Sequence, residues 1–258
     1  MKTFLLASAT ILFVCGPAVA QDHRDIRVRA GLGGQLKPEF IGSDDVQFGP
    51  LWDIDVARGT DAFPFEAPDD SFGIRLFSKG GFTIGPAANI EWKRKESDVG
   101  AAVGNVKTTV ELGGFAEYLP SETIRVRAEL RQGVNGHEGL VGWFGADRIW
   151  RDGDRYVFSI GPRVLFSDAK YQRAYFGVDS DAALASGLPS YRPSGGIHAV
   201  AAASGISYQF NPRFGLFGFA RYERFVGDAG RSPIVRDLGS RNQLSGGIGL
   251  NYTFTVKR

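Results

Sequence analysis

One stretch of the chain alternates without a break between apolar and charged residues, Ile124-Arg125-Val126-Arg127-Ala128-Glu129-Leu130-Arg131. Successive side chains of a β-strand point to opposite faces of the sheet, so this stretch puts its apolar residues on one face and its charged residues on the other. Such a strand needs an apolar environment on one side and a polar environment on the other. The stretch therefore predicts a sheet whose two faces differ sharply in polarity.

The same period of two recurs along the chain. We expect strands near 26–36, 47–57, 71–78, 82–94, 106–119, 122–133, 139–150, 155–167, 196–210, 213–226 and 241–254. Many of these segments have about 10 to 14 residues, the length that a tilted strand needs to cross a bilayer, whereas strands of soluble proteins average about 5 to 6. Tight turns alternate with longer polar connections near 95–105, 168–195 and 227–240. This pattern favours an all-β, transmembrane, antiparallel up-and-down β-barrel.

The strand count has to be even for a bacterial single-chain barrel with both ends in the periplasm, and the pattern above yields an odd number. The segment Asp61–Ala67, with Phe63 and Phe65 two residues apart, is the candidate for a further strand, although Pro64 weakens it. We predict twelve strands, with ten as the alternative. A short helix is expected over Asp181–Ser186 in the longest connection.

Composition and the N-terminus limit the class of protein. The formal net charge is only +2, which gives no basic surplus for nucleic acid, and no apolar run after the first twenty residues is long enough for a membrane helix. Lys2, the apolar run 4–14 and Ala18-Val19-Ala20 form a secretory signal peptide with cleavage near Ala20. We expect a signal peptide over 1–20, a barrel domain over 21–258, and location in the outer membrane of a Gram-negative cell.

Charged residues in phase with the strands should face the barrel axis. This set is Arg27, Arg29, Asp53, Asp55, Arg75, Glu111, Arg125, Arg127, Glu129, Arg131, Arg221 and Glu223. Unpaired burial would cost several kcal/mol for each charge, so the interior must be wet or mutually ion-paired. A paired network that plugs the barrel is favoured over a polar pore, but both remain open. Aromatic residues near strand ends are expected to form girdles at the lipid–water interface: Trp92, Trp143, Trp150, Tyr118, Tyr156, Tyr208, Tyr222 and Tyr252.

The pattern predicts no catalytic residues, no cofactor and no metal site. His198 has no hydroxyl beside it on its own strand, and His137 is expected to be a solvated turn residue. The paired carboxylates Asp44-Asp45 and Asp69-Asp70, like Asp179 with Asp181, lack the ligand pattern of a calcium loop and are interpreted as solvated external loops. We therefore expect a non-enzymatic protein.

Several stretches, in order, cover nearly the whole chain after the signal peptide: Pro38–Asp45, Glu111–Phe115, Tyr175–Val178, Ala185–Tyr191, Tyr222–Arg224, Gly227–Ala229, Ser232–Val235 and Gly239–Gln243. They resemble the MipA/OmpV family of outer-membrane proteins. The family-motif loop residues are Gly42, Ser43, Asp44, Asp45, Tyr175, Phe176, Gly177, Gly187, Leu188, Pro189, Ser232, Pro233, Ser240, Arg241 and Asn242. One departure is that Phe254 is followed by Thr255–Arg258, whereas outer-membrane barrels usually end on an aromatic residue.

The resemblance implies an outer-membrane barrel that contacts outer-membrane lipid and lipopolysaccharide. One type of member is described as a scaffold between a lytic transglycosylase and a bifunctional penicillin-binding protein. The expected function is thus a scaffold or interaction protein for the murein-synthesising machinery, with murein hydrolase or synthase proteins as partners. The alternative is a narrow porin-like channel for small polar solutes.

Overall fold

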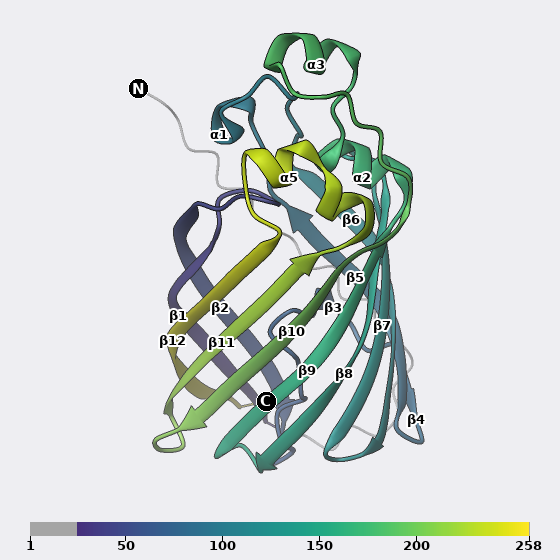
Figure 1. Ribbon diagram of the computed structural model, residues 1–258. Coiled ribbons are helices and arrows are strands. Elements are labelled where there is room, and N and C mark those ends of the chain that lie inside the picture. The colour runs from purple at the N-terminus through teal and green to yellow at the C-terminus, as the bar shows by residue number, and fades with distance from the viewer. Residues whose placement is uncertain (1–24, 258) are drawn as a thin grey trace.

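The computed structural model describes residues 25–257, so the expected signal peptide and its cleavage site lie outside the described residues. The described chain is a single curled antiparallel sheet of twelve strands, with five short helices gathered at one of its ends (Figure 1). The all-β fold class is thereby confirmed. None of the described helices has the length and apolar character to cross a membrane.

The strands are β1 Ile26–Pro38, β2 Val46–Arg58, β3 Phe72–Gly73, β4 Phe77–Lys79, β5 Phe82–Glu91, β6 Thr109–Ser121, β7 Ile124–Gly133, β8 Leu140–Asp152, β9 Tyr156–Ser167, β10 Gly196–Gln209, β11 Phe214–Phe225 and β12 Asn242–Val256. The helices are α1 Glu96–Val99, α2 Ala169–Phe176, α3 Ser180–Ser186, α4 Gly227–Arg231 and α5 Pro233–Asp237.

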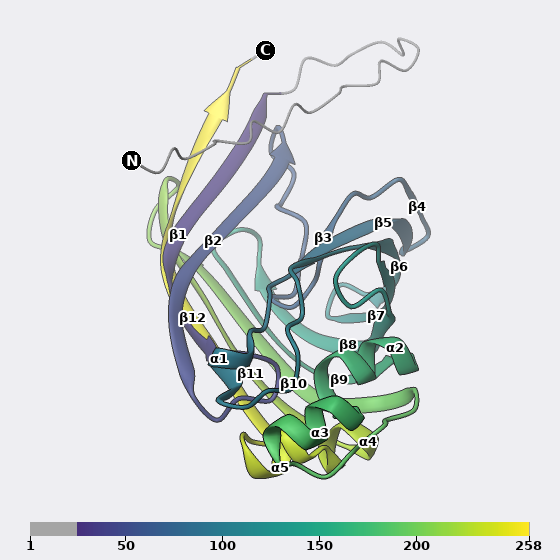
Figure 2. The same ribbon diagram turned by 90° about the horizontal axis from the view of Figure 1, so that it is seen from above.

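The sheet follows the up-and-down order β2-β1-β12-β11-β10-β9-β8-β7-β6-β5-β3, with β4 also paired to β5. The first and the last long strands pair with each other, and Ile26 of β1 lies opposite Val256 of β12. The sheet curls round on itself, and Figure 2 shows β2 and β3 as its two ends. Within residues 25–257 the hydrogen-bonded ladder does not join β2 to β3, so the barrel wall has one seam.

The count of twelve strands is confirmed, but the twelfth strand is not the expected one. Asp61–Ala67 forms no strand, and the count is completed by β3 and β4, two short strands that both pair with β5. Pro64 and Pro68 lack the N–H group that a wall strand donates to its neighbour, which disfavours a ladder here. The residues of this segment find their partners inside the barrel instead.

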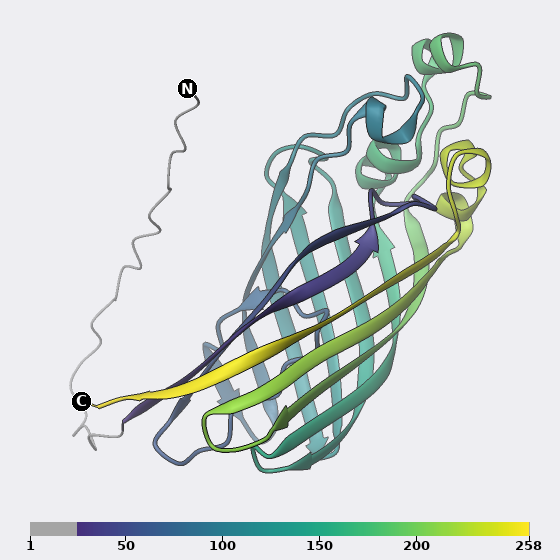
Figure 3. The same ribbon diagram turned by 90° about the vertical axis from the view of Figure 1, so that its left-hand side faces the viewer.

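We call residues 59–71 the lumen segment. It leaves β2 at the end of the sheet opposite the helices, where the Phe63 N–H donates to Asp154 Oδ1 at 2.9 Å. Farther along, Asp70 accepts from Arg125 of β7, and the segment then enters β3. It thus crosses the barrel on the concave side of the sheet. The segment leads inward from one end of the sheet, and β3 and β4 return the chain to that end, so that the ten long strands leave both ends of the described chain at the same end of the sheet (Figure 3).

The two ends of the sheet are built differently. Opposite the helices, strands are joined by the tight turns 80–81, 122–123, 153–155 and 210–213. At the other end lie the long connections, which carry all five helices of the described chain (Figure 3). The expected alternation of short and long connections is confirmed, as is the short helix over Asp181–Ser186, which is α3. We call these the turn end and the helix end.

The convex face of the sheet is apolar, as a lipid-facing surface requires. Its most exposed side chains include Phe48, Leu76 and Trp52, which are 76%, 75% and 66% exposed. All but one of the aromatic residues expected in the girdles are exposed, although Trp92 also lines the cavity described below. The exception is Trp143, which is 6% exposed and lies against Arg163 on the concave side, so its expected position at the lipid interface is wrong. Its odd-numbered neighbours on β8, Val141 and Asp147, face the same way.

Candidate functional site

Arginine and carboxylate side chains fill the concave face of the sheet. The alternation of β7 turns Arg125, Arg127, Glu129 and Arg131 inward, and all four are buried. Antiparallel pairing then sets charges of neighbouring strands side by side, as with Arg127 and Glu117 across β7 and β6. Because opposite charges directly across a ladder attract, the same pattern that makes the strands also assembles the network.

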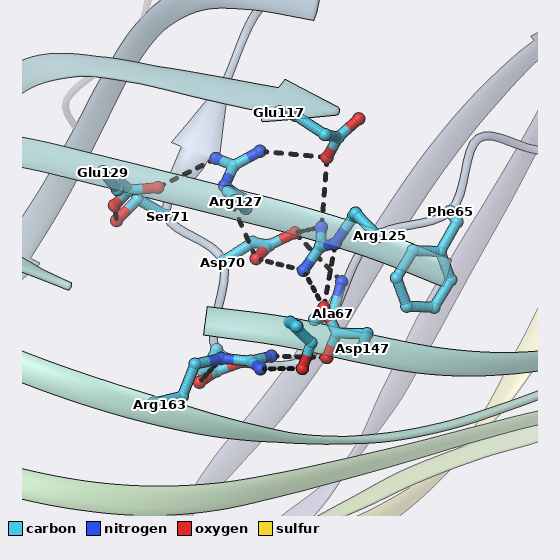
Figure 4. A network of polar contacts seen from close by, with 12 residues as sticks. Phe65, Ala67, Asp70, Ser71, Glu117, Arg125, Arg127, Glu129, Asp147 and Arg163 are labelled. Atoms are coloured by element: carbon cyan, nitrogen blue, oxygen red, sulfur yellow. Dashed lines mark hydrogen bonds and ion pairs between the residues drawn. The ribbon is translucent and has the colours of Figure 1, made fainter. Parts of the chain in front are cut away.

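Arg125 is the centre of this network (Figure 4). Its side chain is fully buried and makes ion pairs with Asp70 at 2.5 Å, Asp147 at 2.7 Å and Glu117 at 3.2 Å. These three carboxylates come from the lumen segment, β8 and β6. The guanidinium also lies 4.8 Å from the ring centre of Phe65, a cation–π contact. Arg125 therefore joins the lumen segment to two strands of the wall.

A second line of pairs runs along β7 toward the helix end. Arg127 bonds Glu129 at 2.8 Å, and Glu129 also accepts from Arg131 and from the Ser71 hydroxyl of the lumen segment. Arg131 in turn donates to Glu111 of β6 at 2.8 Å. Each buried charge on this line has an opposite charge beside it, which offsets the cost of removing it from water.

Asp69 fastens the lumen segment to the opposite part of the wall. Both of its carboxylate oxygens accept from Arg163 of β9, at 2.9 and 3.0 Å, and Arg221 of β11 lies 3.9 Å away. Arg221 pairs with Glu223 at 2.5 Å. A bidentate arginine–carboxylate pair fixes orientation as well as charge. Asp69 and Asp70 together therefore hold the segment between β7 and β9.

The turn end is closed by aromatic and ionic contacts. Phe63, 2% exposed, lies with its ring centre 4.8 Å from the Arg27 guanidinium and 4.5 Å from that of Arg29. Arg27 pairs with Asp154 at 3.0 Å, and Arg29 pairs with Asp55 at 2.6 Å. The lumen segment thus fills this end of the barrel with an apolar ring between two cations.

Two residues of the expected inward-facing set have looser surroundings. Asp53 is half-buried on the same side of β2 as Asp55. Arg75 lies between β3 and β4 rather than on a continuous strand, and it is exposed, with Glu117 at 3.7 Å and the Phe65 carbonyl at 2.8 Å. Both residues border the seam between β2 and β3 and therefore lack a flanking strand on one side.

Sequence reasoning missed several members of the network. Glu117, Asp147 and Arg163 are in phase with inward-facing residues of expected strands, so the alternation itself could have identified them. Asp69 and Asp70 were expected in a solvated external loop, and that expectation is wrong because both lie in the lumen. No local pattern marks them, since their arginine partners are at least 55 residues away in the chain.

His137 and His198 are both buried, unlike the solvated histidine expected at position 137. His137 Nε2 lies 2.9 Å from Glu111, and the Thr109 hydroxyl accepts from its backbone N–H. His198 Nδ1 lies 3.0 Å from the Ser167 hydroxyl of β9, so cross-strand pairing supplies a hydroxyl that the strand's own sequence lacks. No carboxylate pairs with His198 in the described residues, and Ser167 does not line the cavity described below. The pair therefore lacks the carboxylate and the access of a hydrolase site.

The family-motif residues gather at the helix end. Gln243 of β12 binds the connection between β1 and β2, residues 39–45. Its Oε1 accepts from the Gly42 N–H at 3.2 Å, and its Nε2 donates to the Ser43 carbonyl at 2.9 Å. The buried Ser232 hydroxyl donates to the Phe176 carbonyl at 2.8 Å and so joins α5 to α2. These contacts bring motif residues from three connections into one cap over the barrel.

The remaining motif residues occupy defined positions in this cap. Tyr175 and Phe176 are buried on α2, Gly177 ends α2, and Pro233 begins α5. Gly187 ends α3 in the left-handed region at φ 75°, and Leu188 and Pro189 follow it. Ser240 and Arg241 precede β12, and Asn242 is its first residue. Asp44 and Asp45 are exposed in the first connection.

Arg94 fixes the cap to the connection after β5. It is 2% exposed and donates to the Tyr175 carbonyl at 2.7 Å and the Gly104 carbonyl at 3.1 Å. Burial lowers the pKa of Arg94 to about 10, so the side chain stays positive at neutral pH. Burial likewise raises the pKa of Tyr175. The Arg94 cation thus bonds the backbone of Tyr175, while the Tyr175 phenol stays neutral.

A polar cavity of about 440 Å³ lies between the network and this cap. Its floor is the end of the lumen segment, Pro68–Ser71, and its roof includes Tyr171 and Tyr175 of α2. The cavity is on the helix-end side of the ion pairs. Among the described residues, no group of three metal-ligating side chains is placed to hold a metal ion.

Comparison with known proteins gives one clear family and distant structural similarity. An outer-membrane channel from Pseudomonas putida F1 is similar over 92% of this chain and 100% of its own, at 9% identity and a TM-score of 0.45. The NanC porin is similar over 89% and 98%, at 10% identity and a TM-score of 0.38. No curated protein matches the sequence. The model of the family described as MltA-interacting protein MipA matches residues 30–254, nearly the whole described chain, and the protein therefore belongs to the MipA family.

Proposed function

We propose that this protein is an outer-membrane barrel that does not conduct solutes and acts as a scaffold for the murein-synthesising machinery. The observation that carries the proposal is the lumen segment. Its Phe63, Asp69 and Asp70 are tied to the wall by cation–π contacts and ion pairs, and they occupy the space that a pore would need. A filled barrel acts through the surfaces at its two ends.

The turn end is the surface proposed for murein enzymes. Short turns of outer-membrane barrels face the periplasm, where murein lies. The turns at this end carry exposed charges, including Glu122 and the pair Asp152–Arg155, whose side chains are 60% and 69% exposed. The family description names an interaction with MltA, and a lytic transglycosylase of that type is the partner proposed here. The helix end then faces lipopolysaccharide and the medium.

A narrow channel is the second candidate, and the cavity of about 440 Å³ is the observation in its favour. The cavity is polar and reaches the helix end, as the outer half of a pore would. Conduction would also require a path past Phe63 and the Arg125 network toward the turn end. The described residues fill that region with buried side chains, so the scaffold is the better supported function.

Capture of a purified lytic transglycosylase by the detergent-solubilised barrel tests the scaffold. We expect saturable capture by the native chain and at least tenfold weaker capture after charge reversal at the turn end, Lys79→Glu, Glu122→Lys and Arg155→Glu, because rim charges set the electrostatic fit of an interface. The matched control reverses exposed charges at the helix end, Asp181→Lys, Arg192→Glu and Arg236→Glu, and should bind like the native chain. Absence of capture by a folded native barrel would contradict the proposal.

A further inference from the structure

The polar cavity at the helix end contains many charges, and most of them are already paired. Glu111 has three partners: Arg131 at 2.8 Å, His137 at 2.9 Å and Asn89 at 3.0 Å. Arg163 and Arg221 on the opposite side are paired with carboxylates as described above. These groups have their charges offset within the protein, and they give the cavity a polar wall without leaving it a free charge.

Three charged residues of the cavity lining, Glu39, Lys93 and Arg94, make no ion pair within the described chain, but Glu39 and Lys93 are exposed and Arg94 donates to backbone carbonyls. Two further charged residues of the lining are unpaired and half-buried. Lys37, near the end of β1, and Glu91, the last residue of β5, make no ion pair with any residue of the described chain. Both point to the concave side, because they follow the phase of Arg29 on β1 and of Ala87 on β5. Strand β2 with its neighbour β1 lies on one side of the seam and β5 on the other, so the two free charges flank the cavity from opposite sides.

The roof adds a third unsatisfied group. The hydroxyl of Tyr175 is buried, in a residue only 1% exposed; the Thr109 side chain lies near it, but no described residue makes a hydrogen bond of normal geometry with it. A buried hydroxyl without a partner costs about 1 to 3 kcal/mol, so such groups usually face water or a ligand. Tyr175 lines the same cavity as Lys37 and Glu91. Its volume, about 440 Å³, lies within the range of about 300 to 1,000 Å³ typical of small-molecule sites.

We propose that this cavity binds a small zwitterion of the amino-acid or short-peptide class. The ligand's ammonium group pairs with Glu91 and its carboxylate pairs with Lys37, while the Tyr175 hydroxyl hydrogen-bonds the ligand between them. A simple cation would leave Lys37 unpaired, and a simple anion would leave Glu91 unpaired. A neutral molecule with opposite charges at its two ends satisfies both. The inference is independent of the scaffold function, because the cavity lies at the opposite end of the barrel.

Titration calorimetry with the detergent-solubilised chain tests the site. L-Alanine, L-alanyl-L-alanine and tri-L-alanine serve as probes of increasing length, and one of them is expected to bind saturably and best. Its N-acetyl derivative, which lacks the ammonium group, and its C-terminal amide, which lacks the carboxylate, are each expected to bind at least tenfold more weakly. The basis is that a hydrogen bond to a charged group is worth about 1.5 to 3 kcal/mol, and about 1.4 kcal/mol corresponds to a factor of ten.

Two variants separate ligand binding from a structural role. Glu91→Gln should abolish the preference for the free peptide over its N-acetyl derivative but keep the preference over the amide, and Lys37→Gln should do the reverse. Glu138→Gln and Lys170→Gln, exposed charges outside the cavity lining, are the matched controls and should leave both preferences unchanged. Heat-modifiable gel mobility checks that each variant is folded.

Three outcomes would overturn the proposal. The first is no saturable binding of any of the three peptides by the folded native chain. The second is equal affinity for the free, acetylated and amidated forms. The third is an equal loss of affinity for the free, acetylated and amidated forms in both cavity variants, which would mean that Lys37 and Glu91 only support the fold.

Discussion

Replacing Arg125 with leucine is expected to lower the free energy of unfolding by about 3 to 5 kcal/mol, the range found when one partner of a buried ion pair is removed. The substitution leaves Asp70, Asp147 and Glu117 close together without the cation they share. None of these carboxylates is replaced by an apolar group, so the charges remain buried. Urea unfolding of the barrel in lipid vesicles, followed by tryptophan fluorescence, measures the loss.

The control for Arg125 is Arg213→Leu in the turn 210–213, because this side chain is exposed and makes no ion pair with any residue of the described chain. It should change the free energy of unfolding by less than about 0.5 kcal/mol, as surface substitutions usually do. Arg125→Lys keeps the charge but loses the planar fork, so an intermediate loss is expected. A loss below about 1 kcal/mol for Arg125→Leu would show that Arg125 does not hold the network together.

Emptying the lumen segment of side chains is expected to convert a non-conducting barrel into an ion channel. Substituting Gly and Ser for residues 61–70 keeps the chain length between β2 and β3 but removes Phe63, Phe65, Asp69 and Asp70 from the lumen. The wall arginines Arg125 and Arg163 then lose two carboxylate partners, and water can enter. Planar bilayer recordings should show steady open steps for the variant and none for the native chain.

The same replacement over residues 180–186, which form α3 at the helix end, is the control and should leave the barrel non-conducting. Steady openings of the native chain would contradict the filled lumen and would favour the channel. A folded but silent lumen variant would show that the segment does not close the barrel.

The strands of the barrel wall could be predicted from local sequence, because the alternation of residues within each strand indicates which face is apolar and which is polar. Ile124–Arg131 requires lipid on one side and charge partners on the other, whatever the rest of the chain does. The twelve-strand count was also predictable, from the requirement that both ends return to the same side of the membrane. No local pattern predicts how the chain returns, which is through the lumen segment inside the barrel and then β3 and β4.

Residues 59–71 illustrate why the lumen was harder to predict. Phe63 and Phe65 have the spacing of a strand, but their rings meet arginines from β1 and β7 rather than lipid. Asp69 and Asp70 look like a solvated loop in the sequence, and only the distant Arg125 and Arg163 make them structural. Such roles depend on contacts between residues far apart in the chain, which single-strand periodicity does not encode.

Three of the four tryptophans of the chain offer the most direct test of the central claim, that the apolar face meets lipid while the ionic face encloses the axis. Trp52 and Trp150 lie on the convex face and are 66% and 42% exposed, whereas Trp143 is 6% exposed against Arg163. The measurement is fluorescence quenching by brominated lipid, in vesicles, of three variants that each retain one of these tryptophans. We expect strong quenching of Trp52 and Trp150 and little quenching of Trp143. Equal quenching of Trp143, or none of the other two, would contradict the assignment of the two faces.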